Sequence, residues 1–447
     1  MTSYEGKRVL VAGARTAGEA SAKALLNAGA EVTVLDRVEL PSFAPLRAAG
    51  ATVIASDEPP AGLLDKVSDV VVSPGFPPHH PLAVAALAAG LDVYSEPELA
   101  WRLRGPDAPT WLGVTGTNGK TTTTTMLAAI LAAAGKRTAA LGNIGEPLVF
   151  ATDYDVIAVE LSSFQLHWSS TLAPAAGAIL NLADDHLDWH GGFDNYARAK
   201  TAVWRSGTAI GNADDPRVRE MLAHAPGEKV TFTLGPPAPG GFGVVDGVLV
   251  HGDTALIGAD RIRPPGRHNV ANALAAAALA RAYGVDVAAV HDGLAGYTPE
   301  PHRNAYVATV SGVDYVDDSK ATNPHAALGS LTAYPRVVWI AGGQLKGVDV
   351  DDLVRSVADR LAGAVLLGVD RAEIAAALAR HAPGIPVVDV ARVDDGAMAD
   401  VVRAAAAMAG PGDTVLLAPA AASKDMFTSF EARGHAFAAA VRALTGA

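Results

Sequence analysis

The residues best suited to chemistry lie in one loop in the first third of the chain. An apolar stretch runs into Gly116, and a little further on Gly119 is followed directly by Lys120 and then Thr121. This order suits a phosphate cradle, because glycines let successive N–H groups point at phosphate oxygens, the lysine adds positive charge and a hydroxyl can reach Mg²⁺. The strict P-loop pattern would place a further glycine at Val114. The sequence therefore predicts a P-loop-type nucleotide site rather than an ordinary strand-to-helix turn.

Carboxylates and a histidine follow two later apolar segments. Residues 155–160 predict a buried strand that ends in Glu160, where P-loop enzymes present an acid to the metal ion of the nucleotide. Asp185 and His186 follow another such segment, and Lys200 lies in the helix after them. Mg²⁺ takes mostly oxygen ligands and tolerates an imidazole. Beside a phosphate loop these residues indicate metal or phosphate contacts, and the alternative is that the acids and the histidine only cap a helix.

The elements that position these residues begin with a Rossmann-type unit. An apolar strand, a glycine turn and an alanine-rich helix lead into a second strand that ends at Asp36. Arg15 stands where the dinucleotide fingerprint has its middle glycine, which disfavours close approach of a pyrophosphate and so disfavours an NAD enzyme. A further strand runs into a loop with Ser73 and Gly75, at the end of a sheet where α/β proteins bind ligands.

Two proline-containing segments, which we expect to be linkers, divide the chain at residues 105–109 and 297–303. Strands and helices alternate again beyond the second segment, which indicates a further Rossmann-like sheet. We therefore predict an α/β protein with a Rossmann-like N-terminal domain, a central P-loop-type ATPase domain with a mainly parallel sheet, and a Rossmann-like C-terminal domain. The expected bounds are 1–107, 108–299 and 300–447.

The composition narrows the functional classes. A formal net charge of −12 over 447 residues disfavours a nucleic-acid partner, which a basic face would normally bind. The absence of cysteine excludes disulfides, thiolate nucleophiles and cysteine-based zinc sites. No long uncharged apolar stretch and no signal peptide are evident, so we expect a cytoplasmic protein without a membrane span.

Several motifs resemble, in their order along the chain, those of the Mur ligases of peptidoglycan synthesis, and the resemblance covers the whole chain. These motifs are residues 116–121, Glu160, Asp185 with His186, His268 with Asn269 and Asn272, His302 with Arg303, and residues 318–323. Residues 160–166 are similar to the branch of that family that adds D-glutamate. The resemblance implies ATP-driven amide synthesis in the cytoplasm, an early step of cell wall biogenesis on which cell shape and division depend. The carboxylate of UDP-N-acetylmuramoyl-L-alanine would attack the γ-phosphate of ATP, and the amine of D-glutamate would attack the resulting acyl phosphate. The protein would act as a monomer.

The resemblance also assigns roles to individual residues. The ATP phosphates would meet Gly116, Thr117, Asn118, Gly119, Lys120, Thr121 and Thr122. The rest of the nucleotide would meet Asn269, Asn272, Arg303, Asp318 and Lys320. Two Mg²⁺ sites would be formed by Thr121, Glu160, His186 and Lys200, the lysine as a carbamate. The residues expected to be catalytic are Lys120, Glu160, His186 and Lys200.

The two remaining substrates have their own expected residues. The UDP-sugar would lie against Arg15, Thr16, Asp36, Arg37, Ser73, Gly75, Asn143 and His186. D-glutamate would lie against Thr322, Lys346, Ser423 and Phe430. The sequence differs from the family pattern near this second set, at Gln344, Leu345 and Lys424.

Three other functions are compatible with parts of the sequence. Another ligase of the same superfamily could add a different amino acid or extend folate with glutamate, but the first domain and residues 162–165 favour the D-glutamate branch. A non-catalytic nucleotide switch would not need the lysines of the third domain, and the Asn-Lys-x-Asp motif of GTPases is absent. A dehydrogenase is disfavoured by Arg15.

Overall fold

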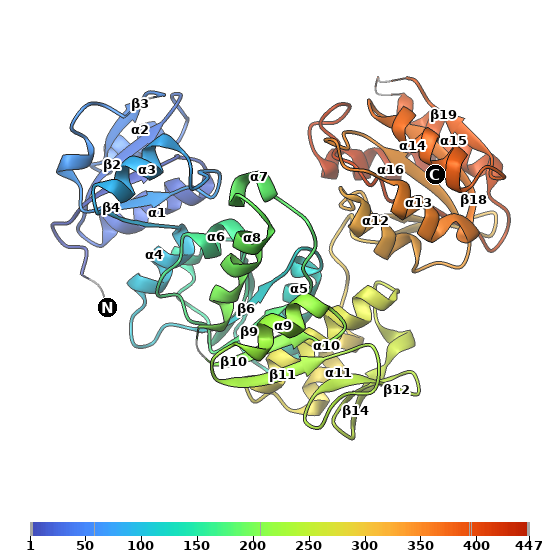
Figure 1. The fold of residues 1–447 in the computed structure, drawn as a ribbon, viewed down its shortest axis with the longest axis horizontal. Coiled ribbons are helices and arrows are strands. Elements are labelled where there is room, and N and C mark those ends of the chain that lie inside the picture. The colour runs from blue at the N-terminus through green and yellow to red at the C-terminus, as the bar shows by residue number, and fades with distance from the viewer. Residues whose placement is uncertain (1–2, 58, 206, 393, 395, 445–447) are drawn as a thin grey trace. The chain divides into compact units, whose positions relative to one another are not determined.

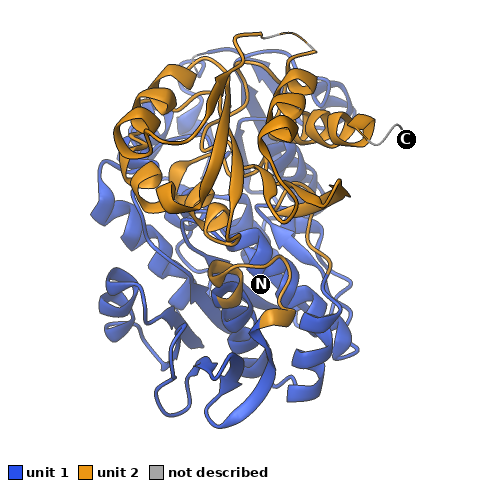
Figure 2. Ribbon diagram, turned by 90° about the vertical axis from the view of Figure 1, so that its right-hand side faces the viewer, with its two compact units in different colours: residues 1–259, 271–297 blue, residues 260–270, 298–447 orange. Residues whose placement is uncertain are grey.

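The computed structural model describes residues 3–57, 59–205, 207–392, 394 and 396–444 (Figure 1). The chain forms two compact units, which Figure 2 distinguishes by colour. The first unit holds two β-sheets and the second holds one. The units consist of Met1–Ala259 with Ala271–Tyr297, and of Asp260–Val270 with Thr298–Ala447.

The N-terminal sheet is a Rossmann-type sheet of five parallel strands in the order β3-β2-β1-β4-β5. Its central strand β1 is buried from its second residue onwards, as expected for a parallel strand covered on both faces. The strands are β1 (Arg8–Ala12), β2 (Glu31–Asp36), β3 (Thr52–Ala55), β4 (Asp69–Val72) and β5 (Asp92–Tyr94). The helices are α1 (Thr16–Asn27), α2 (Phe43–Ala48), α3 (Pro81–Ala88), α4 (Glu96–Leu103) and the short η1 (Leu64–Lys66).

The central sheet has nine strands in the order β14-β13-β12-β11-β10-β9-β6-β8-β7. Only its last strands, β12 to β14, pair antiparallel. Asp246 and Gly247 connect β12 to β13 with φ of +47° and +77°, the left-handed pair that a two-residue hairpin requires. The strands are β6 (Thr110–Thr115), β7 (Ala140–Gly142), β8 (Val156–Glu160), β9 (Ala176–Ile179), β10 (Thr208–Asn212), β11 (Glu228–Phe232), β12 (Phe242–Val245), β13 (Val248–His251) and β14 (Thr254–Gly258).

The helices between residues 120 and 295 accompany this sheet, and most of them belong to the first unit. The helix α10 crosses from the second unit into the first. The helices are α5 (Lys120–Ala133), η2 (Leu148–Phe150), α6 (Ser163–His167), α7 (Leu187–His190), α8 (Phe193–Lys200), η3 (Thr201–Trp204), α9 (Pro216–Ala223), η4 (Ala259–Arg261), α10 (Arg267–Ala282) and α11 (Val287–Ala295).

The sheet of the second unit has six strands in the order β15-β16-β20-β17-β18-β19, and only β15 pairs antiparallel. Its helices are α12 (Pro324–Leu331), α13 (Asp351–Val357), η5 (Ala358–Arg360), α14 (Arg371–His381), α15 (Ala397–Met408) and α16 (Phe430–Leu444). Its strands are β15 (Ala305–Val310), β16 (Val313–Asp317), β17 (Val337–Gly342), β18 (Leu361–Leu367), β19 (Val387–Asp389) and β20 (Thr414–Leu417).

The structure confirms the predicted α/β class with mainly parallel sheets. The domain bounds 1–107, 108–299 and 300–447 stay a prediction, since the division into compact units keeps the first two sheets together. None of the described helices is long and apolar enough to cross a membrane.

The helix α4 carries a buried carboxylate whose protonation affects stability. The Glu96 side chain is 3 % exposed, and its Oε1 accepts the N–H of Val149 at 2.9 Å. Burial raises the pKa of Glu96 to about 7, although backbone hydrogen bonds from Val149 and Leu148 oppose that shift. The folded chain therefore holds a proton that the unfolded chain releases above its ordinary pKa of 4.5.

We expect Glu96→Gln to stabilise the protein at pH 8 and to have little effect at pH 5. The wild type loses stability as the pH rises from about 4.5 to 7, because ionising the buried carboxyl becomes part of the cost of folding, and the amide has no such cost. The free-energy difference is at most about 3.5 kcal/mol, from the roughly 1.4 kcal/mol that one pKa unit represents. Thermal unfolding of both proteins across this pH range measures it. A Tm difference that does not change with pH would contradict the assignment.

Candidate active site

The phosphate loop folds around its own lysine. Gly119 has a φ of +84°, and a Cβ at this position would lie 2.3 Å from Oδ1 of Asn272, so glycine is required both by conformation and by space. The Nζ of Lys120 donates to the carbonyl oxygens of Gly116 at 2.9 Å and Thr117 at 2.8 Å. Lys120 is also the first residue of α5, so the ammonium lies beside a helix N-terminus, where phosphate groups bind well.

Strand register brings a carboxylate to this loop. The strands β6 and β8 are parallel neighbours, and Val114, the last residue but one of β6, pairs with Glu160, the last residue of β8. The Oγ1 of Thr121 donates to Oε2 of Glu160 at 2.6 Å, and Nδ2 of Asn143 donates to Oε1 at 2.9 Å. The predicted residues Thr121, Asn143 and Glu160 therefore meet, and their oxygens are of the hard type that Mg²⁺ prefers.

Two residues that the sequence analysis did not assign to the site hold the phosphate loop in shape. Asn181, after β9, accepts the N–H of Asn118 at 2.8 Å and donates to the carbonyl oxygen of the same residue at 3.0 Å. The Tyr196 hydroxyl lies 2.7 Å from Oγ1 of Thr117. No local pattern marks either residue, because each acts only through contacts far along the chain.

Lys200 is buried against the same loop. Lys200 is 1 % exposed, and its Nζ donates to the carbonyl oxygen of Gly116 at 2.9 Å. The Nζ also lies 4.6 Å from the centre of the Tyr196 ring. Burial lowers the pKa of Lys200 well below its ordinary value, and the charge of Lys120 lowers it further. The low pKa favours a neutral amine, which is the nucleophilic form of lysine.

His186 lies at the edge of this group. It adopts a φ of +53°, its side chain is half exposed, and its Nε2 lies 3.5 Å from Oδ2 of Asp185. Its ring packs on Phe164, with ring centres 4.7 Å apart. A second histidine, His190, is buried and lies 3.0 Å from Oγ of Ser163, and burial lowers its pKa to about 4.

The fit of a magnesium ion can be judged from these donors. Within the described ranges no group of three or more His, Asp or Glu side chains is close enough to hold a metal ion. Of the four expected ligands, Thr121 and Glu160 are hydrogen-bonded to each other. This donor set fits Mg²⁺, which is usually held by one or two protein ligands, substrate phosphates and water.

Six of the eight predicted UDP-sugar residues, all except Asn143 and His186, lie at the carboxyl edge of the N-terminal sheet. Arg15, Thr16 and Arg37 are exposed there. Asp36 accepts the N–H of Ala14 at 2.8 Å with one carboxylate oxygen, so this acid also stabilises the turn after β1. The loop after β4 comes close, because a Cβ at Gly13 would lie 2.8 Å from Cβ of Ser73, while Gly75 is exposed.

The second unit holds its own set of predicted residues. Nδ1 of His302 lies 2.6 Å from Oδ2 of Asp317. Asp318 is buried and accepts hydrogen bonds from the N–H of Asn304 and the hydroxyl of Ser330. Burial raises the pKa of Asp318 to about 6 against the effect of these hydrogen bonds.

The remaining predicted residues of this unit lie mostly in loops. The Nζ of Lys320 lies 3.8 Å from the centre of the ring of Phe430, the first residue of α16. Thr322 is half-buried in the same loop as Lys320, and Arg303 is half-buried just before β15. Lys346 is exposed with a φ of +57°, and Ser423 is buried.

Arg433 joins the loops that carry these residues, although the sequence analysis did not single it out. It lies on α16 and is 1 % exposed. Its guanidinium donates to Oγ and the carbonyl oxygen of Ser319, both at 2.9 Å, and to the carbonyl oxygens of Gly342 and Ala421. Burial lowers its pKa to about 10, so it stays charged at neutral pH. Three strand-end loops are thereby held together around one cation.

The two asparagines of α10 belong to different units. Asn269 is buried, and its Nδ2 donates to the carbonyl oxygen of Pro265 at 3.2 Å. Asn272 is buried against Gly119 of the phosphate loop. A separate cavity of about 750 Å³ lies between α8 and α9, and none of the predicted site residues lines it.

Comparison with known proteins gives the class to which this fold and site belong. Residues 114–280 match the model of the Mur ligase middle domain, and residues 302–421 match that of the Mur ligase, glutamate ligase domain. The chain belongs to the Mur ligase family.

Individual relatives are more specific. The chain is 54 % identical to the UDP-N-acetylmuramoylalanine–D-glutamate ligase of Thermobifida fusca, over 99 % of each chain. It is 50 % identical to the ligase of the same name from Streptomyces avermitilis, over 99 % of this chain and 100 % of the relative.

Solved structures support the same fold. The UDP-N-acetylmuramate–alanine ligase MurC of Thermotoga maritima aligns with a TM-score of 0.60 at 18 % identity, over 98 % of this chain and 99 % of that one. MurF of Acinetobacter baumannii aligns with a TM-score of 0.59 at 21 % identity, over 92 % of this chain and 89 % of that one. At these identities the likeness concerns the fold alone.

Proposed function

We propose that this protein is an ATP-dependent ligase that joins D-glutamate to UDP-N-acetylmuramoyl-L-alanine in cytoplasmic peptidoglycan precursor synthesis. The observation that carries the proposal is the identity of about 50 % over full length with ligases named for this reaction. The phosphate loop with Lys120, and the contact between Thr121 and Glu160 beside it, supply the groups that ATP chemistry needs.

The reaction has two steps. A carboxylate oxygen of the UDP-sugar substrate attacks the γ-phosphorus of ATP, the bond to the β–γ bridging oxygen breaks, and ADP leaves. The amine of D-glutamate then attacks the carbonyl carbon of the acyl phosphate, loses a proton, and expels phosphate as the amide forms. Phosphoryl transfer depends mainly on positioning and positive charge, so a site without a protein nucleophile is sufficient.

The phosphate loop has the first role in this scheme. Backbone N–H groups from Gly119 onwards, at the N-terminus of α5, bind the phosphates. Lys120 stabilises the negative charge that develops on the leaving ADP. Thr121 and Glu160 would hold Mg²⁺, which when bound neutralises phosphate charge.

Lys200 and His186 have a second role in the proposal. As in the family that the chain resembles, Lys200 would be carbamylated and would serve with His186 at a second Mg²⁺ site. An ammonium cannot bind a cation, whereas a carbamate offers carboxylate-like oxygens. The neutral amine favoured by the lowered pKa is the form that reacts with carbon dioxide.

The other substrates are assigned by sheet. Residues at the carboxyl edge of the N-terminal sheet would bind the UDP-sugar, together with two residues of the central domain: Arg15, Thr16, Asp36, Arg37, Ser73, Gly75, Asn143 and His186. The second unit would contribute to the nucleotide through Arg303, Asp318 and Lys320, and the adenine would meet Asn269 and Asn272. D-glutamate would be bound by Thr322, Lys346, Ser423 and Phe430.

A substrate panel tests the proposed function. Purified protein is incubated with ATP, Mg²⁺, UDP-N-acetylmuramoyl-L-alanine and one amino acid at a time, and phosphate release and the coupled product are measured. D-glutamate should support turnover and L-glutamate should not. Steady ADP production without any amino acid, or equal turnover with L-lysine or L-alanine, would refute the assignment.

A further inference from the structure

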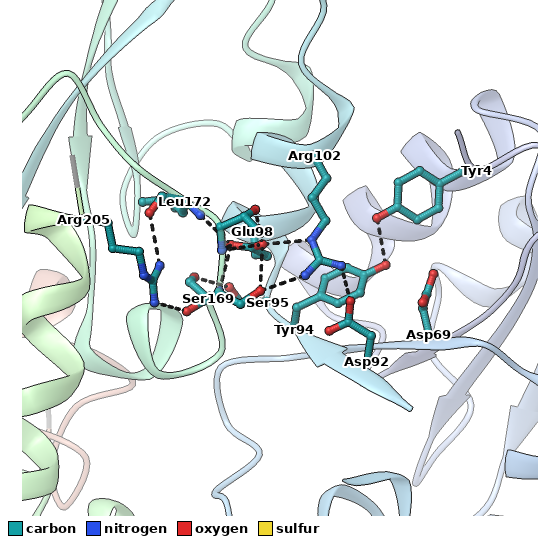
Figure 3. Close-up of polar contacts among 12 residues, drawn as sticks. Tyr4, Asp69, Asp92, Tyr94, Ser95, Glu98, Arg102, Ser169, Leu172 and Arg205 are labelled. Atoms are coloured by element: carbon teal, nitrogen blue, oxygen red, sulfur yellow. Dashed lines mark hydrogen bonds and ion pairs between the residues drawn. The ribbon is translucent and has the colours of Figure 1, made fainter. Parts of the chain in front are cut away.

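A buried carboxylate of α4 binds a loop of the central domain (Figure 3). Glu98 is 0 % exposed. Its oxygens accept the backbone N–H groups of Ser170, Thr171 and Leu172 at 3.1, 3.0 and 2.9 Å, and the hydroxyl of Thr171 at 2.6 Å. Burial would raise the pKa of Glu98, but the hydrogen bonds outweigh it and hold the pKa below its usual range. Glu98 is therefore a charged group that closes the turn at residues 170–172.

Arg102 connects this carboxylate to the N-terminal sheet. One helical turn after Glu98, its Nε donates to Oε1 of that residue at 2.9 Å. Its other nitrogens donate to Asp92 on β5 at 2.5 Å and to the Ser170 hydroxyl at 3.0 Å. The guanidinium lies 4.0 Å from the centre of the Tyr94 ring. One side chain thus contacts the last strand of the N-terminal sheet, α4 and the central loop.

The loop at residues 169–172 is also connected to the segment that contains Glu160 and to the segment that contains Lys200. It follows α6, which begins three residues after Glu160 with a capping box between Ser162 and Gln165. From the other side, Arg205 donates to the carbonyl oxygens of Leu172 and Ser169, and Arg205 ends the helical segment that continues from Lys200.

Further contacts fix the end of α6 to the N-terminal domain. The N–H of Ser95 donates to the carbonyl oxygen of Trp168 at 2.8 Å, and its hydroxyl donates to that of Gln165 at 3.0 Å. Nε1 of Trp168 donates to the carbonyl oxygen of Phe76, in the loop after β4, at 3.1 Å. The segment that starts at Glu160 therefore ends in hydrogen bonds with the N-terminal domain, to Ser95 and to the loop after β4.

We propose that Glu98 and Arg102 are positioning residues for the ligation. They hold the N-terminal sheet in a defined position relative to residues 160–172. In this way they position the carboxylate of the UDP-sugar substrate relative to the γ-phosphate of ATP. The proposal rests on the proposed function, which assigns the UDP-sugar to the N-terminal sheet and ATP to the phosphate loop. Because a displacement of about 1 Å between reacting groups can cost about a hundredfold in rate, a charged, buried joint of this kind affects turnover directly.

The test compares Glu98→Gln and Arg102→Lys with the wild type. Glu98→Gln removes the charge but keeps the shape, and Arg102→Lys keeps the charge but loses the fork of donors. We expect kcat to fall tenfold or more in each, while the Kd of an ATP analogue stays within twofold, because the phosphate loop is unchanged. Since the two side chains act as one pair, the double variant should lose less than the product of the single losses. Glu39→Gln breaks the exposed pair between Glu39 and Arg47 of the same domain and is the matched control, with unchanged kcat.

The outcomes distinguish a positioning role of Glu98 and Arg102 from an effect on folding stability alone. A lowered Tm with kcat within twofold of the wild type, measured well below that Tm, would overturn the proposal, as would equal losses in kcat and in affinity for the ATP analogue. Wild-type turnover with D-glutamate is measured in the same assay. If the proposed function is wrong, the wild type and all variants lack this turnover, whereas loss of the positioning role lowers turnover only in the variants. If Glu98→Gln does not fold, the milder Arg102→Lys decides between the outcomes.

Discussion

Lys120→Ala is expected to lower kcat by a factor on the order of 10² to 10³, which is the usual cost of removing one preorganised group that stabilises developing charge. In the structure the ammonium is held by two carbonyl oxygens of the loop, those of Gly116 and Thr117. It therefore points along the inner side of the loop, where the β- and γ-phosphates would bind. We expect the Tm to change by only a few degrees, because the side chain is only half-buried.

The control for this variant is Lys136→Ala. Lys136 is exposed just beyond the other end of the same helix, so its loss changes the net charge equally without touching the loop. Steady-state ADP release with saturating substrates measures both variants. If Lys120→Ala retains wild-type kcat, or if both lysines give the same loss, the role assigned to Lys120 is wrong.

Lys200→Ala is expected to lower activity by about a hundredfold or more. The wild-type side chain is almost fully buried against Gly116 and Tyr196, and in the proposal its carbamate completes a metal site. Because burying the polar end of a lysine is itself costly, the alanine variant should fold without a large loss of stability. Small carboxylic acids should restore part of the activity by supplying the missing carboxylate oxygens.

Lys200→Arg distinguishes the carbamate from a simple cation. A guanidinium keeps the positive charge but does not form this carbamate. We expect the arginine variant to be as impaired as the alanine variant and not to respond to added carboxylic acids. Full activity of Lys200→Arg would show that the lysine acts only through its charge.

Local sequence was sufficient for the elements whose residues act through their neighbours in the chain. Gly119, Lys120 and Thr121 follow one another, so the strand, the turn and the start of α5 could be predicted together. Glu160 ends a continuous apolar strand, and pairing of β8 with β6 places it beside the loop as expected. The shared rule is that parallel strands present their carboxyl ends at one edge of the sheet.

Residues that act across the chain could not be found in this way. Asn181 and Tyr196 support the phosphate loop, and Arg433 gathers the strand-end loops of the second unit, but each depends on register and packing between distant segments. Glu98 is a similar case, since a glutamate on a short helix is usually exposed. Its hydrogen bonds become visible only when the Ser170 turn is placed against α4.

The metal ligands show an intermediate case. The sequence places Asp185 and His186 next to each other, which predicts metal or phosphate contacts there. In the structure His186 is half exposed and packs on Phe164, and among the described residues no three His, Asp or Glu side chains form a group that could hold a metal ion. A ligand on an irregular loop depends on backbone geometry that residue types alone do not specify, so its role as a magnesium ligand stays a prediction.

In the proposed mechanism the substrate carboxylate is activated by direct attack on ATP before D-glutamate is joined to the substrate. The most direct measurement uses UDP-N-acetylmuramoyl-L-alanine with an oxygen-18 label in its carboxylate, together with ATP and D-glutamate, and follows the label by mass spectrometry. We expect each phosphate released to carry one labelled oxygen and the new amide to keep the other. Unlabelled phosphate accompanying amide formation would contradict this mechanism.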